Sequence, residues 1–548
     1  MSILKALRRT KSSGLSRREL FRNGGLLAAA GLAPAAVSSA AAAPSMSFGS
    51  DMYQSIGVRP VINAKGTFTV MSGSLMLPEC RQAMQEASQN FVQLDELMAG
   101  IGKRIAEITG AESAIVSSGC AAALVHATSA CIAGGNPERI ARLPDLEGLK
   151  SEIIAPSWSR NTYDQAVRML GIKFIEVENE QEMRRAISAK TAMVMVLATT
   201  RDKGPFGLKE IASVAHEYDV PVLVDAAAEG LTIPNVHLER GADLVAYSGG
   251  KALRGPQSAG LLIGRKDLIA AAWLNSAPHH AFGRPMKVGK EDAMGMLAAV
   301  EMWVKRDHEA EWKTWESWLA EIANSVERVS GVTTEVSQPR GLSNHSPRLS
   351  VKWDGDRIGI FGDEVEKLLF KGDPRIVLAG SRGRRRSGGE TSVTIMPWQM
   401  QPGNAKVIAA ELHRVLSKPP EMDSKGSPSG PNVDVAGQWE LHIDYVLGSA
   451  DNGLFLEQSG DDLHGTHVGE ATAADIRGWV EGNRVHFMAR HRYEGSGFGF
   501  TFSGHLNGDT MEGEVDLGEY TPYGPAKWSA KRHEYGRPGP VFRPQKNV

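Results

Sequence analysis

Two stretches decide the fold: Val222-Leu223-Val224-Asp225-Ala226-Ala227 and Tyr247-Ser248-Gly249-Gly250-Lys251. In the first, a short apolar run typical of a buried strand ends at the acidic residue Asp225. In the second, Lys251 follows a similar apolar run by a few residues. The strands of a parallel sheet end at a common edge, where ligands bind. We therefore expect Asp225 and Lys251 to lie together in a cleft at that edge.

These two charged residues suit one cofactor, pyridoxal phosphate. A carboxylate at a strand end can keep a heteroaromatic nitrogen protonated, and a partly desolvated lysine becomes a nucleophilic amine. Pyridoxal phosphate needs both, because its ring nitrogen takes an acidic partner and its aldehyde reacts with a lysine. Singly, each residue is nonspecific, since a lysine after two glycines is more often exposed. A third element upstream favours the cofactor.

That third element is the small-residue turn Ser117-Ser118-Gly119-Cys120, which joins a predicted strand at 114–116 to a predicted helix ending near Ile132. The N–H groups and the dipole at such a helix start favour a phosphate. Ser248 is a candidate for a further phosphate hydrogen bond. The turn has neither the Walker nor the GxGxxG pattern. Taken alone, it is equally well read as a tight turn between a strand and a helix.

Strand and helix patterns alternate around these motifs between about 78 and 275, which predicts an α/β domain with a mostly parallel sheet. The predicted strands are 114–116, 153–154, 174–177, 193–197, 222–224, 244–246 and 260–263, and the predicted helices include 94–108, 160–170 and 208–218. From about 300 to 416, a Trp-rich helix, two strand-like pieces and a final helix predict a smaller α+β domain.

The C-terminal part has a different pattern. Residues 417–434 are rich in Pro, Ser and Gly and predict a linker. Beyond it, apolar residues alternate with polar ones and turn signals recur, which predicts an all-β sandwich or barrel over 435–535 with a weak likeness to lipocalins. His464 and His467 are interpreted as exposed turn residues, because no third metal ligand accompanies them.

The first 43 residues are interpreted as an export signal. Arg17 and Arg18 precede a modestly apolar run, 25–37, and then a series of small residues. The run is too short to be a permanent membrane span. This pattern resembles a twin-arginine signal and predicts a periplasmic or secreted protein that uses the twin-arginine machinery. An ordinary secretory signal or a basic amphipathic N-terminus is the alternative. The predicted domains are thus 1–43, 44–300, 301–416, 417–434 and 435–535.

Composition narrows the choice of function. A chain of 548 residues predicts more than one domain, and 42% hydrophobic with 23% charged residues is typical of globular proteins. The net charge of −2 argues against a nucleic-acid partner, because binding to a polyanion needs a concentrated positive field. The three cysteines show no zinc-site spacing and no disulfide framework, so no metal is expected.

Several motifs in one order carry a resemblance to a known family. They are Pro60–Thr67, Ser117-Ser118-Gly119, Val224–Ala227, Ser248–Lys251, Gly255–Gly260 and Gly283–Glu291. On these motifs, residues of about 52–416 resemble the fold-type-I pyridoxal-phosphate enzymes of the group that includes selenocysteine synthase and D-glucosaminate-6-phosphate ammonia-lyase. The resemblance is specific for fold and cofactor and less specific for the reaction.

The resemblance implies roles for individual residues. Lys251 would bind the cofactor aldehyde and act in catalysis, Asp225 would pair with the ring nitrogen, and the phosphate would be held by Ser118, Gly119, Cys120 and Ser248. Family members often place a His over the cofactor ring near an Arg-Asn-x-Tyr segment, where this chain has Trp158 as its candidate. Arg375, Arg284 and Lys287 are candidate substrate contacts. Such enzymes form homodimers or larger homo-oligomers.

The working hypothesis is an exported enzyme that acts at the Cα of an amino acid or amino sugar acid. The resemblance favours a lyase that catalyses β-elimination, while racemisation and transamination stay open. A selenocysteine-synthase-like transferase is disfavoured by export and by the near-zero charge. A noncatalytic exported binding protein on the same fold is a further alternative, but such a protein would need neither Lys251 nor Asp225.

Overall fold

The computed structural model describes residues 49, 51–199, 206–421 and 431–534. The described residues fall into two units, which divide between Pro60 and Val61. The described part of the first unit holds the short helix α2 (Met52–Ser55), and the predicted export signal lies outside the described residues. Across the described chain, no helix has the length and apolar character to cross a membrane.

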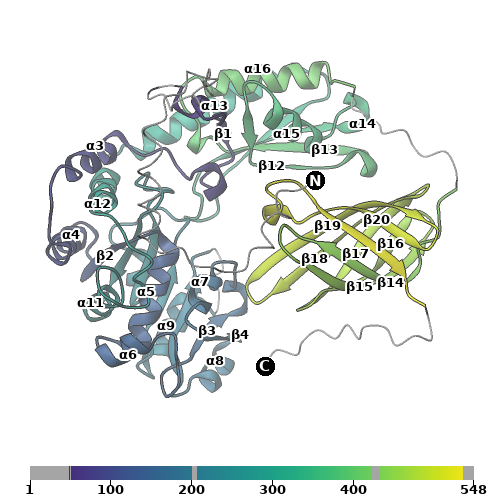
Figure 1. Cartoon of the computed structure of the whole chain (residues 1–548). Helices are drawn as coiled ribbons and strands as arrows, with labels where there is room; N and C mark the ends of the chain where they lie inside the picture. Colours follow the sequence, from purple (N-terminus) through teal and green to yellow (C-terminus); the bar gives the residue numbers. More distant parts are fainter. Residues whose placement is uncertain (1–48, 50, 200–205, 422–430, 535–548) are drawn as a thin grey trace, which may run out of the picture. The chain divides into compact units, whose positions relative to one another are not determined.

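A seven-stranded sheet forms the centre of the large domain (Figure 1). Its order is β2 (Ser113–Ser117), β8 (Gly260–Gly264), β7 (Leu244–Ser248), β6 (Val222–Asp225), β5 (Thr191–Leu197), β3 (Glu152–Pro156) and β4 (Lys173–Val177). The five strands from β7 to β4 are parallel, which confirms the predicted α/β class. β8 is antiparallel to both of its neighbours, so the sheet is mixed at this edge.

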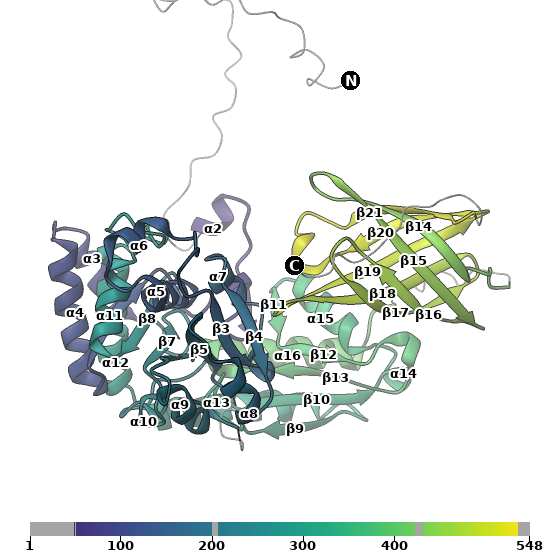
Figure 2. The same ribbon diagram turned by 90° about the horizontal axis from the view of Figure 1, so that it is seen from below.

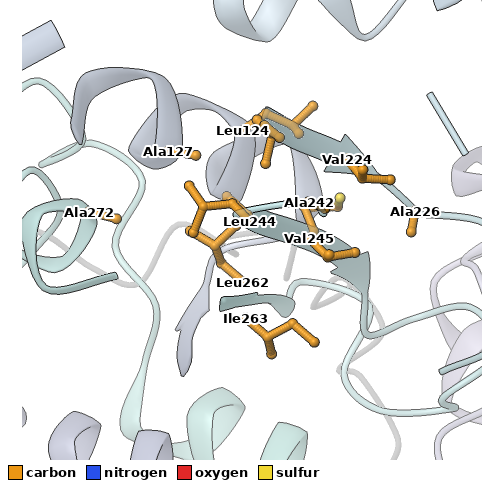
Figure 3. Close-up of a cluster of buried hydrophobic side chains, with 14 of the residues drawn as sticks. Leu124, Ala127, Val224, Ala226, Ala242, Leu244, Val245, Leu262, Ile263 and Ala272 are labelled. Atoms are coloured by element: carbon orange, nitrogen blue, oxygen red, sulfur yellow. The ribbon is translucent and has the colours of Figure 1, made fainter. Parts of the chain in front are cut away.

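Helices pack around this sheet because its strands are apolar on both faces. They are α3 (Pro78–Ala87), α4 (Leu94–Thr109), α5 (Cys120–Ala133), α6 (Pro137–Arg142), α7 (Asp164–Arg168), α8 (Glu180–Ala186), α9 (Leu208–His216), α10 (Val236–Glu239), α11 (Lys266–Leu274) and α12 (Lys290–Lys305). Figure 3 shows Leu124 and Ala127 of α5 with Leu244 and Leu262 in the buried core. Helix α5 is apolar on nearly all sides and is almost wholly buried, which holds its first turn against the sheet.

One predicted helix is wrong in its first half. Helical structure was expected over 160–170, but α7 begins only at Asp164. The preceding residues form a turn, in which the Asn161 side chain accepts a hydrogen bond from the backbone N–H of Tyr163 at 2.8 Å. Asn competes with helix formation in this way, because its short side chain bonds to nearby backbone groups.

The small domain has its own hydrophobic core. Its antiparallel sheet has the order β12 (Gly380–Arg382), β13 (Glu390–Ile395), β10 (Arg348–Asp354) and β9 (Thr333–Ser337), and a parallel pair joins β1 (Ile62–Ala64) to β11 (Ile376–Leu378). The helices are α13 (His308–Val326), α14 (Gly355–Ile358), α15 (Gly362–Lys371) and α16 (Asn404–Ser417). Figure 2 shows β9, β10 and β13 side by side in this part of the chain.

The C-terminal domain is a closed antiparallel barrel of eight strands, so of the two predicted β architectures the barrel is confirmed. In order they are β14 (Gly437–Asp444), β15 (Ser449–Ser459), β16 (Asp462–Val468), β17 (Ala473–Glu481), β18 (Arg484–Tyr493), β19 (Ser496–Asn507), β20 (Thr510–Asp516) and β21 (Ala526–Arg532). β21 pairs with β14 and closes the barrel. Alternate residues such as Trp439, Leu441 and Ile443 fill the interior.

The interpretation of His467 as an exposed turn residue is wrong. Both His464 and His467 lie on β16, where successive side chains point to opposite faces. His464 is exposed, but His467 faces the barrel interior with 0% exposure. Its Nδ1 lies 2.8 Å from Nε2 of His491 on β18. Turn signals in the sequence did not reveal that this histidine belongs to an inward-facing position.

Candidate active site

The structure brings Asp225 and Lys251 to one edge of the sheet. Asp225 is the last residue of β6, and its neighbour β7 runs parallel to β6 and ends three residues before Lys251. Because the strands are parallel, both ends lie on the same side. Lys251 is near enough for its charge to lower the pKa of the Asp225 carboxyl, although burial, the larger influence, raises that pKa.

The Asp225 carboxylate is buried, with 2% exposure. One oxygen accepts a hydrogen bond from the Ala227 N–H at 3.0 Å and lies 3.8 Å from the Cys120 thiol. Burial, and then the charge of Asp225, raise the pKa of Cys120 well above its ordinary value, so the thiol stays protonated. A buried carboxylate strongly favours a cationic partner. The protonated ring nitrogen of pyridoxal phosphate fits this requirement.

The predicted phosphate turn has a tightly packed backbone. Gly119 has φ +87° and precedes α5, which begins at Cys120. A Cβ on Gly260 of β8 would collide with the Gly119 backbone, so the strand and the turn can approach only because residue 260 is glycine. The first N–H groups of α5 have no acceptor within the helix. This helix start therefore fits an anion such as the cofactor phosphate.

A loop from later in the chain meets this turn. The Ser118 hydroxyl donates a hydrogen bond to the Met286 carbonyl at 2.9 Å, a contact that sequence reasoning missed. The candidate substrate residues Arg284 and Lys287 flank Met286 and are exposed. The family resemblance, through the motif 283–291, named Arg284 and Lys287 as candidate contacts. No pattern in the sequence indicated the hydrogen bond that brings this motif to Ser118.

The other predicted residues are dispersed. Ser248 ends β7 and is half-buried, next to the turn that carries Lys251. Arg375 lies at the start of β11 in the small domain. Its guanidinium stacks on the Phe370 ring at 3.9 Å and donates to the Phe370 carbonyl at 3.1 Å. The described contacts of Arg375 are thus within its own domain.

An aromatic side chain, that of Tyr163, lies beside Lys251. The Lys251 ammonium is 5.9 Å from the centre of the Tyr163 ring. Burial, followed by the charge of Asp225, raises the pKa of Tyr163. Trp158, in the short 3-10 helix Ser157–Ser159, packs against the core of the large domain. Tyr163 is the tyrosine of the Arg-Asn-x-Tyr segment, so this segment reaches Lys251 through its last residue.

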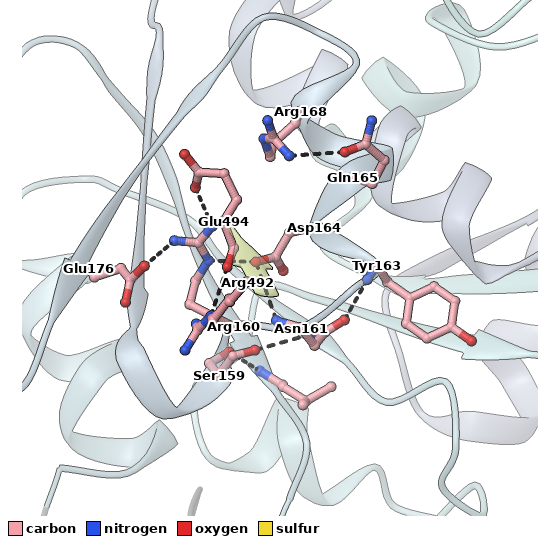
Figure 4. A network of polar contacts seen from close by, with 11 residues as sticks. Ser159, Arg160, Asn161, Tyr163, Asp164, Gln165, Arg168, Glu176, Arg492 and Glu494 are labelled. Carbon is pink, nitrogen blue, oxygen red and sulfur yellow. Dashed lines mark hydrogen bonds and ion pairs between the residues drawn. The ribbon is translucent and has the colours of Figure 1, made fainter. Parts of the chain in front are cut away.

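A buried ion network holds the segment that carries Tyr163 (Figure 4). The side chain of Arg160 is only 1% exposed, and each of its three nitrogen positions meets a carboxylate. Nε contacts Asp164 at 2.5 Å, Nη1 contacts Glu176 at 2.6 Å, and Nη2 contacts Glu494 at 2.6 Å. The guanidinium also lies 4.3 Å from the centre of the Phe174 ring. Glu494 belongs to the barrel, so sequence distance concealed its part in the network.

Three relatives show which known proteins this chain is similar to. D-Glucosaminate-6-phosphate ammonia lyase of Salmonella typhimurium is 28% identical over 67% of this chain and 98% of the relative. The 5'-C-glycyluridine monooxygenase-decarboxylase of a Streptomyces species is 33% identical over 69% and 94%. L-Seryl-tRNA(Sec) selenium transferase of Moorella thermoacetica is 27% identical over 65% and 69%.

A solved structure agrees with these relatives. The structure of D-glucosaminate-6-phosphate ammonia-lyase covers 66% of this chain and 97% of its own, with 29% identity and a TM-score of 0.58. The family model for aminotransferase class-V matches residues 81–283, which include the phosphate turn, Asp225 and Lys251. These neighbours imply pyridoxal phosphate as the cofactor. The chain therefore belongs to the class-V aminotransferase group of fold-type-I pyridoxal-phosphate enzymes.

Proposed function

We propose that the protein acts at the Cα of an amino acid or amino sugar acid and that it is a lyase. The observation that carries the proposal is the meeting of Lys251, buried Asp225 and the Ser118–Cys120 turn at one sheet edge. When bound, pyridoxal phosphate supplies an electron sink for the charge that develops at Cα.

The residues of this site divide the remaining work. The α5 start and the Ser118 turn would hold the phosphate group of the cofactor. The Asp225 carboxylate would keep a proton on the ring nitrogen, and burial would exclude water from that contact. Lys251 would hold the cofactor aldehyde, and its free amine would remove the Cα proton of the substrate as a general base. Loss of a leaving group from the neighbouring carbon completes an elimination.

The Lys251 assignment is tested by substitution. Lys251→Ala should abolish the visible absorbance band of the lysine-bound cofactor, expected near roughly 420 nm, and should abolish turnover. Lys173→Ala, at an exposed position on β4, is the matched control and should leave the band unchanged. A K251A protein that keeps the wild-type spectrum would show that the cofactor is bound elsewhere. A wild-type protein that takes up no cofactor would favour a binding protein instead.

The reaction is tested with D-glucosaminate 6-phosphate as the probe substrate, because the ammonia lyase is among the relatives. A lyase releases ammonia equally with and without oxygen. The 33% identity to the monooxygenase-decarboxylase makes an oxygen-dependent decarboxylation the second candidate. That reaction would consume oxygen and release carbon dioxide, so oxygen uptake separates the two. Racemisation, transamination and group transfer also require the substrate amine to reach the cofactor. A shift of the visible absorbance band on addition of an amino acid would therefore detect a substrate of any of these reactions.

The N-terminal segment of the chain supports a proposal about the location of the protein. Arg17 and Arg18 with the apolar run after them support export by the twin-arginine route to the periplasm or beyond. Replacing both arginines with lysine should retain the protein in the cytoplasm, as measured by cell fractionation.

We also infer from the family resemblance that the protein forms a homodimer or a larger homo-oligomer. Analytical ultracentrifugation measures the mass of the particle in solution, and the mass of a monomer would contradict this inference.

A further inference from the structure

We propose that the two-residue hairpin Glu494-Gly495 of the barrel is a positioning element of the Lys251 site. It holds the Arg160–Tyr163 segment in place and thereby keeps the Tyr163 ring beside Lys251. This inference rests on the proposed function, because it gives the barrel a part in the same site. It assigns a role to the barrel, whose first strand begins at Gly437, after the residues that form the cofactor fold.

Glu494 adopts the left-handed backbone conformation, which is unfavourable for a residue with a side chain. It joins β18 to β19, where Tyr493 pairs directly with Ser496, and its φ is +54°. A hairpin of this length favours Gly, Asn or Asp at a position with positive φ. Strain of this kind persists where surrounding contacts require it. Here the strained residue is the one whose carboxylate reaches Nη2 of Arg160 at 2.6 Å.

Gly495 is required for a different reason. A Cβ at this position would collide with the carbonyl oxygen of Asn161 and with the carboxylate of Asp164. Any other residue would therefore push the hairpin and the Asn161 turn apart. Both hairpin residues are thus suited to contact with the Arg160–Asp164 segment. Residue 494 supplies a negative charge to Arg160, and residue 495 has no side chain that would collide with the segment.

The contacts lead from the hairpin to Tyr163. The backbone carbonyl of Asn161 lies against Gly495. The side chain of Asn161 accepts a hydrogen bond from the backbone N–H of Tyr163. On the other side of Tyr163, the Arg168 guanidinium of α7 lies 5.0 Å from the centre of the Tyr493 ring. The barrel hairpin therefore contacts the chain both before and after Tyr163, which restricts the turn that presents this ring to Lys251.

Loss of the Glu494 carboxylate should loosen this segment rather than unfold the protein. The Arg160 guanidinium would keep Asp164 and Glu176 but lose its third partner while still buried. Small displacements of a positioned group reduce catalysis strongly, and about 1 Å can cost on the order of 10²-fold. We expect Glu494→Asn to raise the dissociation constant for pyridoxal phosphate roughly tenfold and to lower kcat more than it raises KM.

The experiment compares full-length wild type with E494N, E494Q and the control E457Q. Asn tolerates positive φ, so E494N keeps the hairpin conformation while shortening the side chain. E494Q keeps the length and removes the charge. Glu457 is an exposed residue of β15, and its replacement should change nothing. Hydrogen exchange of residues 157–166 is measured in cofactor-free protein, and cofactor affinity is measured by titration with pyridoxal phosphate.

The expected result is faster exchange over 157–166 and weaker cofactor binding in both Glu494 variants, with thermal unfolding close to wild type. Unchanged exchange and affinity in E494N and E494Q would overturn the proposal. A wild-type protein that does not bind pyridoxal phosphate would refute the proposed function instead, and the exchange data would still decide whether the hairpin restrains the segment. Faster exchange throughout the barrel would show a general structural role and would also overturn the proposal.

Discussion

Asp225 and His467 are both buried and titratable, yet burial shifts their pKa values in opposite directions. Burial disfavours the charged form, which is the deprotonated form of a carboxyl and the protonated form of an imidazole. The pKa of Asp225 is therefore raised, and the charge of Lys251 partly opposes this effect. The pKa of His467 is lowered to about 3, first by burial and then by His491. The first shift disfavours an Asp225 carboxylate without a cationic partner, and the second affects the stability of the barrel.

The histidine shift predicts a pH dependence of stability. Because the folded pKa of His467 is about 3 and the unfolded value is about 6.5, the unfolded chain binds the extra proton between these values. Stability is therefore full above about pH 6.5 and falls as the pH drops toward 3, by up to about 1.4 kcal/mol per pH unit. His467→Leu should flatten this part of the profile in denaturant unfolding.

His464 offers the matched control for that measurement, since it is exposed on the same strand. His464→Leu should retain the wild-type profile of unfolding free energy between pH 7 and pH 4. Equal slopes in wild type and H467L would contradict the argument, because they would show that His467 is not the residue that takes up the proton on unfolding.

At the scale of elements, the phosphate turn depends on how closely strand β8 approaches helix α5. Gly260 pairs with Ser117 across the antiparallel β2–β8 ladder, and its Cα faces the backbone of Gly119. The antiparallel direction of β8 was not anticipated by the expected βαβ repeat. It is decided by the tertiary structure, because the sequence contains the strand pattern but not the direction in which the strand enters the sheet.

This packing predicts that Gly260→Ala weakens cofactor binding. The added methyl group must displace the Gly119–Cys120 backbone, at a cost of about 1–3 kcal/mol in stability and with at least tenfold weaker binding of pyridoxal phosphate. Gly100→Ala is the control, because Gly100 lies in helix α4 with open space around its Cα. G100A should be neutral or slightly stabilising. Wild-type affinity in G260A would show that the turn does not hold the phosphate.

At the scale of the whole molecule, the described chain has three hydrophobic cores, one in each domain. Residues 61–548 form a single compact unit, and the Arg160 network joins the large domain to the barrel within it. The small domain also contacts the barrel, since the Arg386 guanidinium lies 4.8 Å from the centre of the Trp479 ring. Arg386 belongs to the basic run 382–386, which is otherwise mostly exposed.

The coupling predicts that loss of the barrel core weakens the cofactor site. Trp439 is 0% exposed, and its Nε1 donates to the Val435 carbonyl at 2.9 Å. Trp439→Ala should destabilise the barrel by about 3–5 kcal/mol and lower the temperature at which the visible cofactor band is lost. Phe455→Ala, at an exposed position on the same barrel, should not. A band that outlasts barrel unfolding in W439A would contradict the coupling.

The sequence by itself determined the fold class, the cofactor and the residues at the two strand ends. These depend on local patterns: apolar periodicity, small residues at turns, and charged residues at strand ends. Only the tertiary structure decided that Tyr163 lies beside Lys251, that β8 runs antiparallel, and that Glu494 joins Arg160. The physical reason is that pairing direction and contacts between separated segments, such as Arg160 and Glu494 at 334 residues apart, depend on how the chain packs in space, so no periodicity or spacing along the chain records them.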